Sequence, residues 1–143
     1  MAEVSFYVLP TESIHERDEF ACKLIEKAYR SGCFCYVLTD NIEQSQKIND
    51  LLWTFRAGSF VPHQLYTGQL PDIKNIILIG SLDAPENWQK TVINLSSHCP
   101  EQFNKIERLL EILDNSEATK ELGRNRYRHY QQSNIKITTH KDW

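Results

Sequence analysis

Three short apolar runs constrain the fold of this chain more than any other feature. They occupy residues 4–9, 33–40 and 76–80 and read VSFYVL, CFCYVLTD and IILIG. Each is rich in β-branched or aromatic residues, which predicts a strand. Because the apolar residues are largely continuous, these strands are expected to be buried on both faces of a sheet. Residues 91–96 give a shorter candidate strand.

Helical patterns separate these runs. Residues 15–30 and residues 41–55 each carry apolar side chains at spacings of three and four, which predicts helices with one buried stripe. The two stripes consist of Phe20, Ala21, Leu24, Ile25, Ala28 and Tyr29, and of Ile48, Leu51, Leu52 and Phe55. Ser31-Gly32 is expected to end the first helix, and Asp40 or Asn41 to cap the second.

Alternating strands and helices indicate a parallel sheet with helices on both faces, because each crossover between parallel strands needs a covering element. The predicted fold is therefore a Rossmann-like three-layer α/β sandwich with a mostly parallel central sheet. The length of 143 residues suits a single domain, 1–143, with a core of its own.

The remaining segments are assigned from weaker patterns. Residues 56–72 contain glycines and prolines without a clear period and predict a long connection. Residues 103–113 show a helix-like stripe, which consists of Phe103, Ile106, Leu110 and Leu113. Asn115 or Ser116 can start a last helix that runs to about Gln132, and residues 137–143 are expected to form a polar tail.

Composition limits the possible partners. The formal net charge of −3 argues against a general attraction to the phosphate backbone of nucleic acids. No apolar run is long enough to span a membrane, and residues 1–10 lack a secretory leader, so we expect a cytoplasmic protein without membrane association. The cysteines at positions 22, 33, 35 and 99 form no zinc-type spacing, and we interpret them as small buried hydrophobes rather than metal ligands.

Catalytic patterns are missing from the sequence. No G-x-G-x-x-G or G-x-x-x-x-G-K-[ST] follows the first strand, and five glycines are few for a phosphate cradle. The five histidines form no metal or hydrolase motif, and His98-Cys99 is the single adjacent Cys/His pair. We therefore expect no intrinsic enzyme activity and no cofactor, with a nucleotide-using enzyme as the remote alternative.

The basic charge is concentrated near the end of the chain. Between residues 116 and 143 there are six Lys or Arg and three Asp or Glu, a local net charge of +3. Helical spacing places four of these side chains on one face, namely Lys120, Arg124, Tyr127 and Arg128. This face could be solvated, could grip an acidic peptide that ends in an aromatic residue, or could bind single-stranded nucleic acid directly.

A second candidate surface lies in residues 51–65. Here Trp53, Phe60, Val61 and Pro62 add a large apolar area in and beside a predicted loop. Aromatic residues of this kind often anchor protein interfaces. The alternative is a loop that folds back over the core.

Several of these motifs together resemble the chi subunit family of the bacterial DNA polymerase III holoenzyme. The resemblance covers nearly the whole chain in order: FYVL near the start, LLW followed by SFVPH, and R-x-R-Y-R-x-Y before a tail that ends in Trp. The most specific parts are W-x6-FVPH and the R-x-R-Y-x-x-Y block. The family implies a Rossmann-like fold related to helicase domains but without ATP chemistry.

The resemblance also implies partners and site residues. In this family the psi subunit, which connects chi to the clamp loader, is bound around positions that match Trp53, Phe60 and Pro62. The acidic, Phe-terminated tail of single-stranded DNA-binding protein is bound on the last helix. The matching positions for this tail are Lys120, Arg124, Tyr127 and Arg128, with Trp143 as the terminal aromatic. Contact with DNA would then be indirect.

Overall fold

A computed structural model describes residues 3–56, 58, 60–101 and 103–140. In this part of the chain seven strands form one sheet, and every pairing between neighbouring strands is parallel. The strand order is β3-β4-β2-β5-β6-β1-β7. The strands are β1 Glu3–Val8, β2 Tyr36–Leu38, β3 His63–Leu65, β4 Ile77–Gly80, β5 Thr91–Asn94, β6 Arg108–Leu113 and β7 Lys136–His140.

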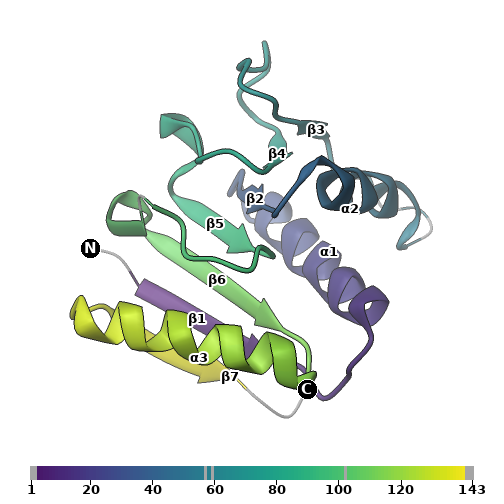
Figure 1. Cartoon of the computed structure of the whole chain (residues 1–143). Helices are drawn as coiled ribbons and strands as arrows, with labels where there is room; N and C mark the ends of the chain where they lie inside the picture. The colour runs from purple at the N-terminus through teal and green to yellow at the C-terminus, as the bar shows by residue number, and fades with distance from the viewer. Residues whose placement is uncertain (1–2, 57, 59, 102, 141–143) are drawn as a thin grey trace.

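Helices cover both faces of the sheet, as Figure 1 shows. The helices α1 (Ile14–Arg30) and α2 (Ile42–Thr54) pack on one face, and α3 (Glu117–Gln132) packs on the other together with the short 3-10 turns Glu86–Trp88 and Phe103–Lys105. Each face encloses its own apolar cluster, since alternate strand residues point to opposite sides. The predicted Rossmann-like three-layer fold is confirmed.

Side-chain caps fix where the three helices begin. The Ser13 hydroxyl accepts from the Glu16 amide at 3.2 Å, and the Asn41 side-chain oxygen accepts from the Gln44 amide at 2.9 Å. Ser116 Oγ likewise accepts from the Thr119 amide at 3.3 Å and starts α3. Of the alternative caps considered above, the structure thus uses Asn41 and Ser116. No helix in the described residues is both long and apolar enough to cross a membrane.

Three assignments from the sequence were wrong. Residues 103–113 are not a helix but a 3-10 turn followed by β6, which is buried along five of its six residues. The described part of the predicted polar tail, residues 137–140, belongs to the edge strand β7 (Lys136–His140). The connection of residues 56–72 contains the other edge strand, β3.

Two candidate protein-binding surfaces

The helix α3 lies on the sheet with one side inward and one side outward. Gly123, Arg126 and Tyr130 are buried against the strands. The side chains of Arg124 and Arg128 stand on the outer side. The cations of α3 therefore lie in two environments. Arg124 and Arg128 are exposed, whereas Arg126 is buried although it lies within the same basic segment.

Arg126 is held by a buried polar network. Its Nε donates to both carboxylate oxygens of Glu111 on β6 at 3.2 Å, and its Nη1 donates to the Ser97 carbonyl at 3.1 Å. The Tyr130 hydroxyl and the side-chain Nδ2 of Asn94 donate to the same carboxylate at 2.6 and 3.1 Å. Burial and the neighbouring Glu111 carboxylate raise the pKa of Tyr130, so its phenol remains a donor. The network attaches α3 to the sheet.

The outer cations surround a cavity of about 400 Å³ between α3 and the strands. Its apolar floor comes from neighbouring strands and includes Phe6, Val8 and Leu113, with Thr139 of β7 at one side. The remaining lining residues come from α3 and are Lys120, Gly123, Arg124, Tyr127 and Arg128. The four described residues that the sequence assigned to tail binding thus line one cavity, whereas Trp143 lies outside the described residues.

Among the described residues, the cations at the rim have partners only on α3 itself. Lys120 Nζ lies 3.2 Å from Glu117, Arg124 Nη1 lies 3.3 Å from Glu121, and Arg128 Nη1 donates to Asn125 at 3.0 Å. These contacts span one turn of helix at the surface. Exposed pairs of this kind contribute little to stability, so an incoming carboxylate can replace them.

Tyr127 turns partly into the cavity. Its ring centroid lies 5.5 Å from that of Phe6, at an interplanar angle of 48°. The ring therefore forms part of an apolar wall instead of standing free as a flat platform. The sequence pattern found Tyr127 but not Phe6 or Leu113, since the floor residues come together only when β1 and β6 pair.

Gly123 allows the close approach of α3 to the sheet. A Cβ atom at this position would lie 2.5 Å from Leu113 Cδ1, closer than two carbon atoms can pack. We expect Gly123→Ala to lower the free energy of unfolding by up to about 2 kcal/mol, measured by urea denaturation, because overpacking costs about 1–3 kcal/mol and alanine gains about 1 kcal/mol over glycine within a helix. Asn125→Ala on the exposed side of α3 is the control and should change it by less than about 0.5 kcal/mol. If Gly123→Ala raised the free energy of unfolding by the full helix-propensity gain of about 1 kcal/mol, the close packing would be contradicted.

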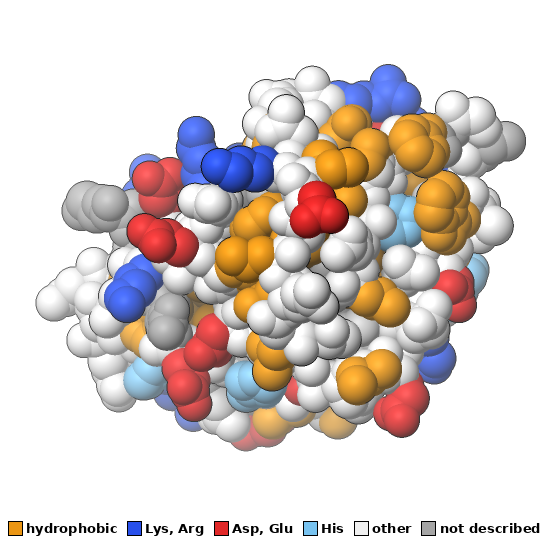
Figure 2. Space-filling model, turned by 90° about the horizontal axis from the view of Figure 1, so that it is seen from above, with side chains coloured by type: hydrophobic (Ala, Val, Ile, Leu, Met, Phe, Trp, Pro, Cys, Tyr) orange, Lys and Arg blue, Asp and Glu red, His pale blue; other side chains and the backbone are white. Residues whose placement is uncertain are grey.

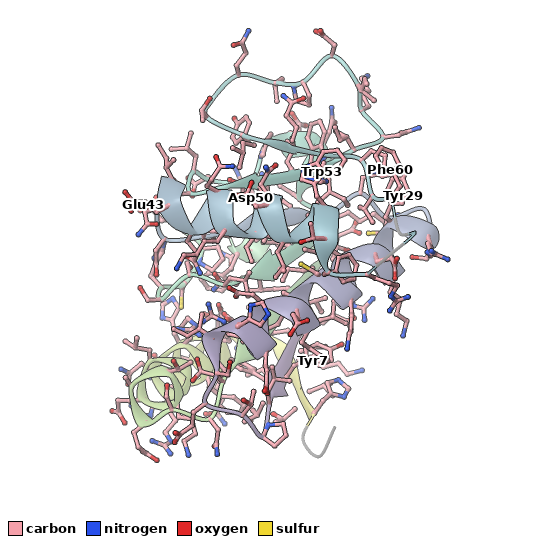
Figure 3. The ribbon with its side chains drawn as sticks, turned by 90° about the vertical axis from the view of Figure 1, so that its right-hand side faces the viewer. Tyr7, Tyr29, Glu43, Asp50, Trp53 and Phe60 are labelled. Carbon is pink, nitrogen blue, oxygen red and sulfur yellow. The ribbon has the colours of Figure 1, made fainter. Side chains whose placement is uncertain are left out.

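The second surface lies at the end of α2 and the start of β3. Trp53 and Phe60 are 57% and 66% exposed, and their ring centroids lie 5.9 Å apart. Pro62 beside them is half-buried, whereas Val61 points into the core. Figure 3 shows Trp53 and Phe60 side by side, and Figure 2 shows hydrophobic side chains reaching the surface on the side where α2 and β3 lie. Two large aromatic rings are therefore exposed to solvent at this surface.

His63 links the parts of this aromatic surface. Its ring lies 4.8 Å from the Trp53 ring, and its two nitrogens lie 2.6 Å from the Val61 carbonyl and 3.0 Å from the Asn49 carbonyl. Asn49 belongs to α2 and Val61 to the segment that leads into β3. The histidine therefore fixes the position of this segment relative to the helix that carries Trp53.

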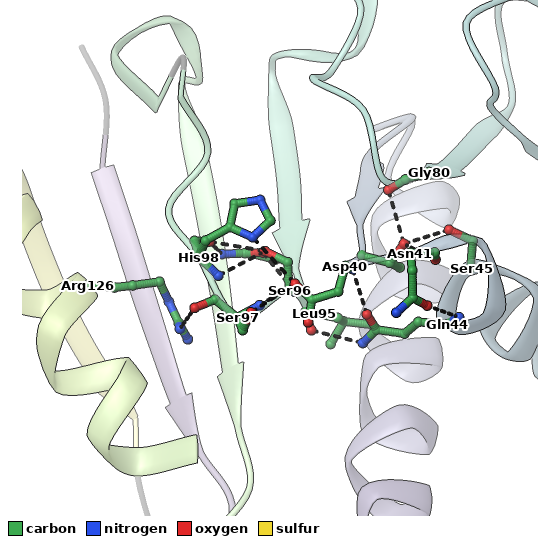
Figure 4. A network of polar contacts seen from close by, with 12 residues as sticks. Asp40, Asn41, Gln44, Ser45, Gly80, Leu95, Ser96, Ser97, His98 and Arg126 are labelled. Atoms are coloured by element: carbon green, nitrogen blue, oxygen red, sulfur yellow. Dashed lines mark hydrogen bonds and ion pairs between the residues drawn. The ribbon is translucent and has the colours of Figure 1, made fainter. Parts of the chain in front are cut away.

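The carboxyl ends of β2 and β5 carry a polar network, which Figure 4 shows. Asp40 Oδ1 accepts from the amide and the hydroxyl of Ser97 at 2.9 and 3.0 Å, and its backbone amide donates to Gln44 at 2.7 Å. Gln44 in turn donates to the Leu95 carbonyl at 2.9 Å. Folds of this class bind nucleotides at this edge of the sheet. Here the polar groups bind one another, which gives them a structural role.

Two of the four cysteines, Cys22 and Cys35, are buried in the core, whereas Cys33 and Cys99 are half-buried. Burial raises the pKa of Cys22 to about 12 and also raises the pKa of Cys35, which disfavours the thiolate needed for metal binding. Cys33 differs from the predicted buried hydrophobe, because it is only half-buried and its Sγ donates to Thr91 Oγ1 at 3.1 Å. Among the described residues no three His, Cys, Asp or Glu side chains form a group able to hold a metal ion.

Comparisons with known proteins point to one family. The family model described as "DNA polymerase III chi subunit, HolC" matches residues 1–138. The DNA polymerase III subunit chi of Pseudomonas aeruginosa is 28% identical over 141 residues, which cover 99% of this chain and 97% of that relative. The corresponding proteins of Haemophilus influenzae and Escherichia coli are 26% and 21% identical, over 94% and 97% of this chain and 93% and 97% of their own lengths.

A solved structure supports the fold alone. The crystal structure of T4 UvsW matches 98% of this chain and 42% of its own chain with a TM-score of 0.69 and 11% sequence identity. At that identity the likeness describes how the strands and helices are arranged and carries no statement about activity.

Proposed function

Because this chain belongs to the DNA polymerase III chi subunit family, we propose that it is a non-catalytic accessory subunit that joins two other replication proteins. The cavity under α3 binds the acidic C-terminal tail of single-stranded DNA-binding protein. The surface around Trp53, Phe60 and Pro62 binds the psi subunit, which connects the chain to the clamp loader. As a replication subunit the protein would act in the cytoplasm.

The cavity is the observation that carries this proposal. Its volume of about 400 Å³ lies within the usual range for ligand sites. The floor of Phe6, Val8 and Leu113 suits a phenylalanine ring, whose burial contributes about 1.5–3 kcal/mol. Arg124 and Arg128 at the rim suit carboxylates, which guanidinium groups bind in a bidentate manner. A peptide with a terminal aromatic residue and nearby acids offers both kinds of group.

Direct binding of single-stranded DNA is the competing function. It would need aromatic rings that lie open to stacking bases. Tyr127 instead packs against Phe6, and the chain as a whole carries a net charge of −3. The geometry therefore favours a peptide over bases as the ligand.

Arg124→Ala should weaken binding of an acidic, Phe-terminated peptide by about tenfold or more, because a charged hydrogen bond contributes about 1.5–3 kcal/mol. Isothermal titration calorimetry at low and at physiological salt measures this, and affinity should fall with salt. Arg108→Ala, on the surface at the start of β6, is the control and should bind as the wild type does.

Two outcomes would contradict the tail-binding proposal. One is unchanged peptide affinity in Arg124→Ala. The other is an affinity of the wild-type chain for a naked single-stranded oligonucleotide that equals its affinity for the peptide at physiological salt.

A further inference from the structure

The outer side of α2 carries a stripe of side chains that leads to the aromatic surface. Glu43, Gln46, Asp50 and Trp53 follow one another at spacings of three, four and three, so they lie on one side of the helix. All four are exposed. In Figure 3, Glu43, Asp50 and Trp53 lie in this order along α2, and Phe60 lies next to Trp53.

The two carboxylates of this stripe have no cationic partner in the described part of the chain. Asp50 Oδ1 accepts from the side-chain amides of Gln46 and Asn49 at 2.9 and 3.4 Å, and neither is a cation. The exposed Lys47 lies between the two carboxylates on α2, so the stripe with this lysine keeps a net charge of −1. The cation that follows Trp53 in the sequence, Arg56, is bound to Glu26 of α1 at 2.9 Å. The surface therefore combines exposed aromatic rings with a net negative charge.

We propose that the partner covers this surface with a basic amphipathic helix that lies along α2. An apolar side chain of that helix packs on Trp53 and Phe60, and Lys or Arg side chains face Asp50 and Glu43. At a rise of 1.5 Å per residue, Asp50 lies about 5 Å and Glu43 about 15 Å from Trp53 along the axis. The matching bases thus lie about one turn and about three turns from the anchor. This inference rests on the proposed psi-binding role of the aromatic surface.

The negative charge of this surface distinguishes between the molecules that could cover it. A second copy of this chain, docked by the same face, would bring two stripes of net negative charge together, and like charges repel. An acidic segment would be repelled in the same way. A basic segment places opposite charge at both positions, and such pairs chiefly control which partner binds and how it is oriented, while the rings supply most of the affinity.

The test measures the affinity of the chain for the psi subunit of the same genome by calorimetry at low salt. Asp50→Lys should weaken binding about fivefold to twentyfold, and Asp50→Asn, which keeps the oxygen that accepts from Gln46, should weaken it less. Both differences should shrink at high salt. Glu107→Lys, an exposed acid before β6, makes the same charge change away from the surface and should have no effect.

The outcomes distinguish a failure of the basic-helix proposal from a failure of the proposed psi-binding function. If Trp53→Ala abolishes psi binding while Asp50→Lys binds as the wild type does, the basic helix is excluded but the aromatic contact stands. If psi does not bind the wild-type chain, or binds Trp53→Ala unchanged, both are overturned. Single Lys→Glu or Arg→Glu changes in psi that restore binding to Asp50→Lys and Glu43→Lys should be spaced as on one helical face. Because Asp50 and Glu43 lie about 10 Å apart along α2, rescue positions about seven residues apart would fit a helix, whereas positions about three residues apart would indicate an extended strand and contradict the helix.

Discussion

Arg126→Met should lower the free energy of unfolding by about 3–5 kcal/mol, as expected when one member of a buried ion pair is removed. Arg126 is 5% exposed, and its Nε donates to both oxygens of Glu111, which is fully buried. Without the guanidinium the Glu111 charge keeps only the donors of Tyr130 and Asn94. Those two neutral hydrogen bonds cannot replace the lost opposite charge.

Urea denaturation of Arg126→Met and Arg124→Met gives a matched comparison on one helix. Arg124 lies on the outer side, where its contact with Glu121 is exposed, so its replacement should change the free energy of unfolding by less than about 1 kcal/mol. Arg124→Met should instead lose affinity for the tail peptide. Similar stability of the two variants would mean that the Glu111–Arg126 pair does not anchor α3.

A second substitution tests the cause of that loss. Glu111→Gln removes the charge that Arg126→Met leaves unpaired, so the double variant should be more stable than Arg126→Met alone. If the double variant were less stable than the single one, the loss would come from the packing of the arginine stem rather than from the uncompensated carboxylate.

The buried pair also explains why β6 could not be predicted from the sequence. The run RLLEIL contains a glutamate at its centre, and a charged residue argues against a strand buried on both faces. Glu111 is tolerated there because Arg126 approaches from α3, and this contact joins residues fifteen positions apart. In contrast, residues 4–9 and 76–80 contain no such interruption, and the strands β1 and β4 were predicted with nearly correct limits.

The burial of Arg126 could have been predicted from the sequence. On a helix, Arg126 lies about 100° or more around the axis from Lys120, Arg124 and Tyr127, on the side of the buried Tyr130. Counting every cation near the end of the chain as surface charge therefore overstated the basic area. The spacing argument that grouped the four outer residues already excluded Arg126.

The floor of the cavity lay beyond prediction for a different reason. Phe6, Leu113 and Thr139 come from three strands that are neighbours only because β1 lies between β6 and β7 in the sheet. That order follows from the crossovers, and β6 and β7 had not been recognised as strands. The residues of the cationic rim lie on one helix, so its period was enough to predict that they share a face. Predicting the residues of the apolar floor would have required the order of the strands in the sheet.

Alanine substitutions in the aromatic surface should reduce the affinity for psi more than substitutions elsewhere on the chain. Trp53→Ala and Phe60→Ala are each expected to weaken psi binding by about 2 kcal/mol or more, about 30-fold, because large exposed rings at an interface lose much apolar contact when truncated. Calorimetry with purified psi measures the effect. The control is Ile14→Ala, at 58% exposure as open to water as Trp53 but located at the start of α1.

The double variant Trp53→Ala with Phe60→Ala should lose less affinity than the two single losses added together. The rings lie 5.9 Å apart, so each shields part of the other, and removing one already disturbs the contact made by its neighbour. Strict additivity would mean that psi contacts the two rings as separate anchors. Psi binding that survives both substitutions would place its interface elsewhere on the molecule, and the exposure of the two rings would then need another partner.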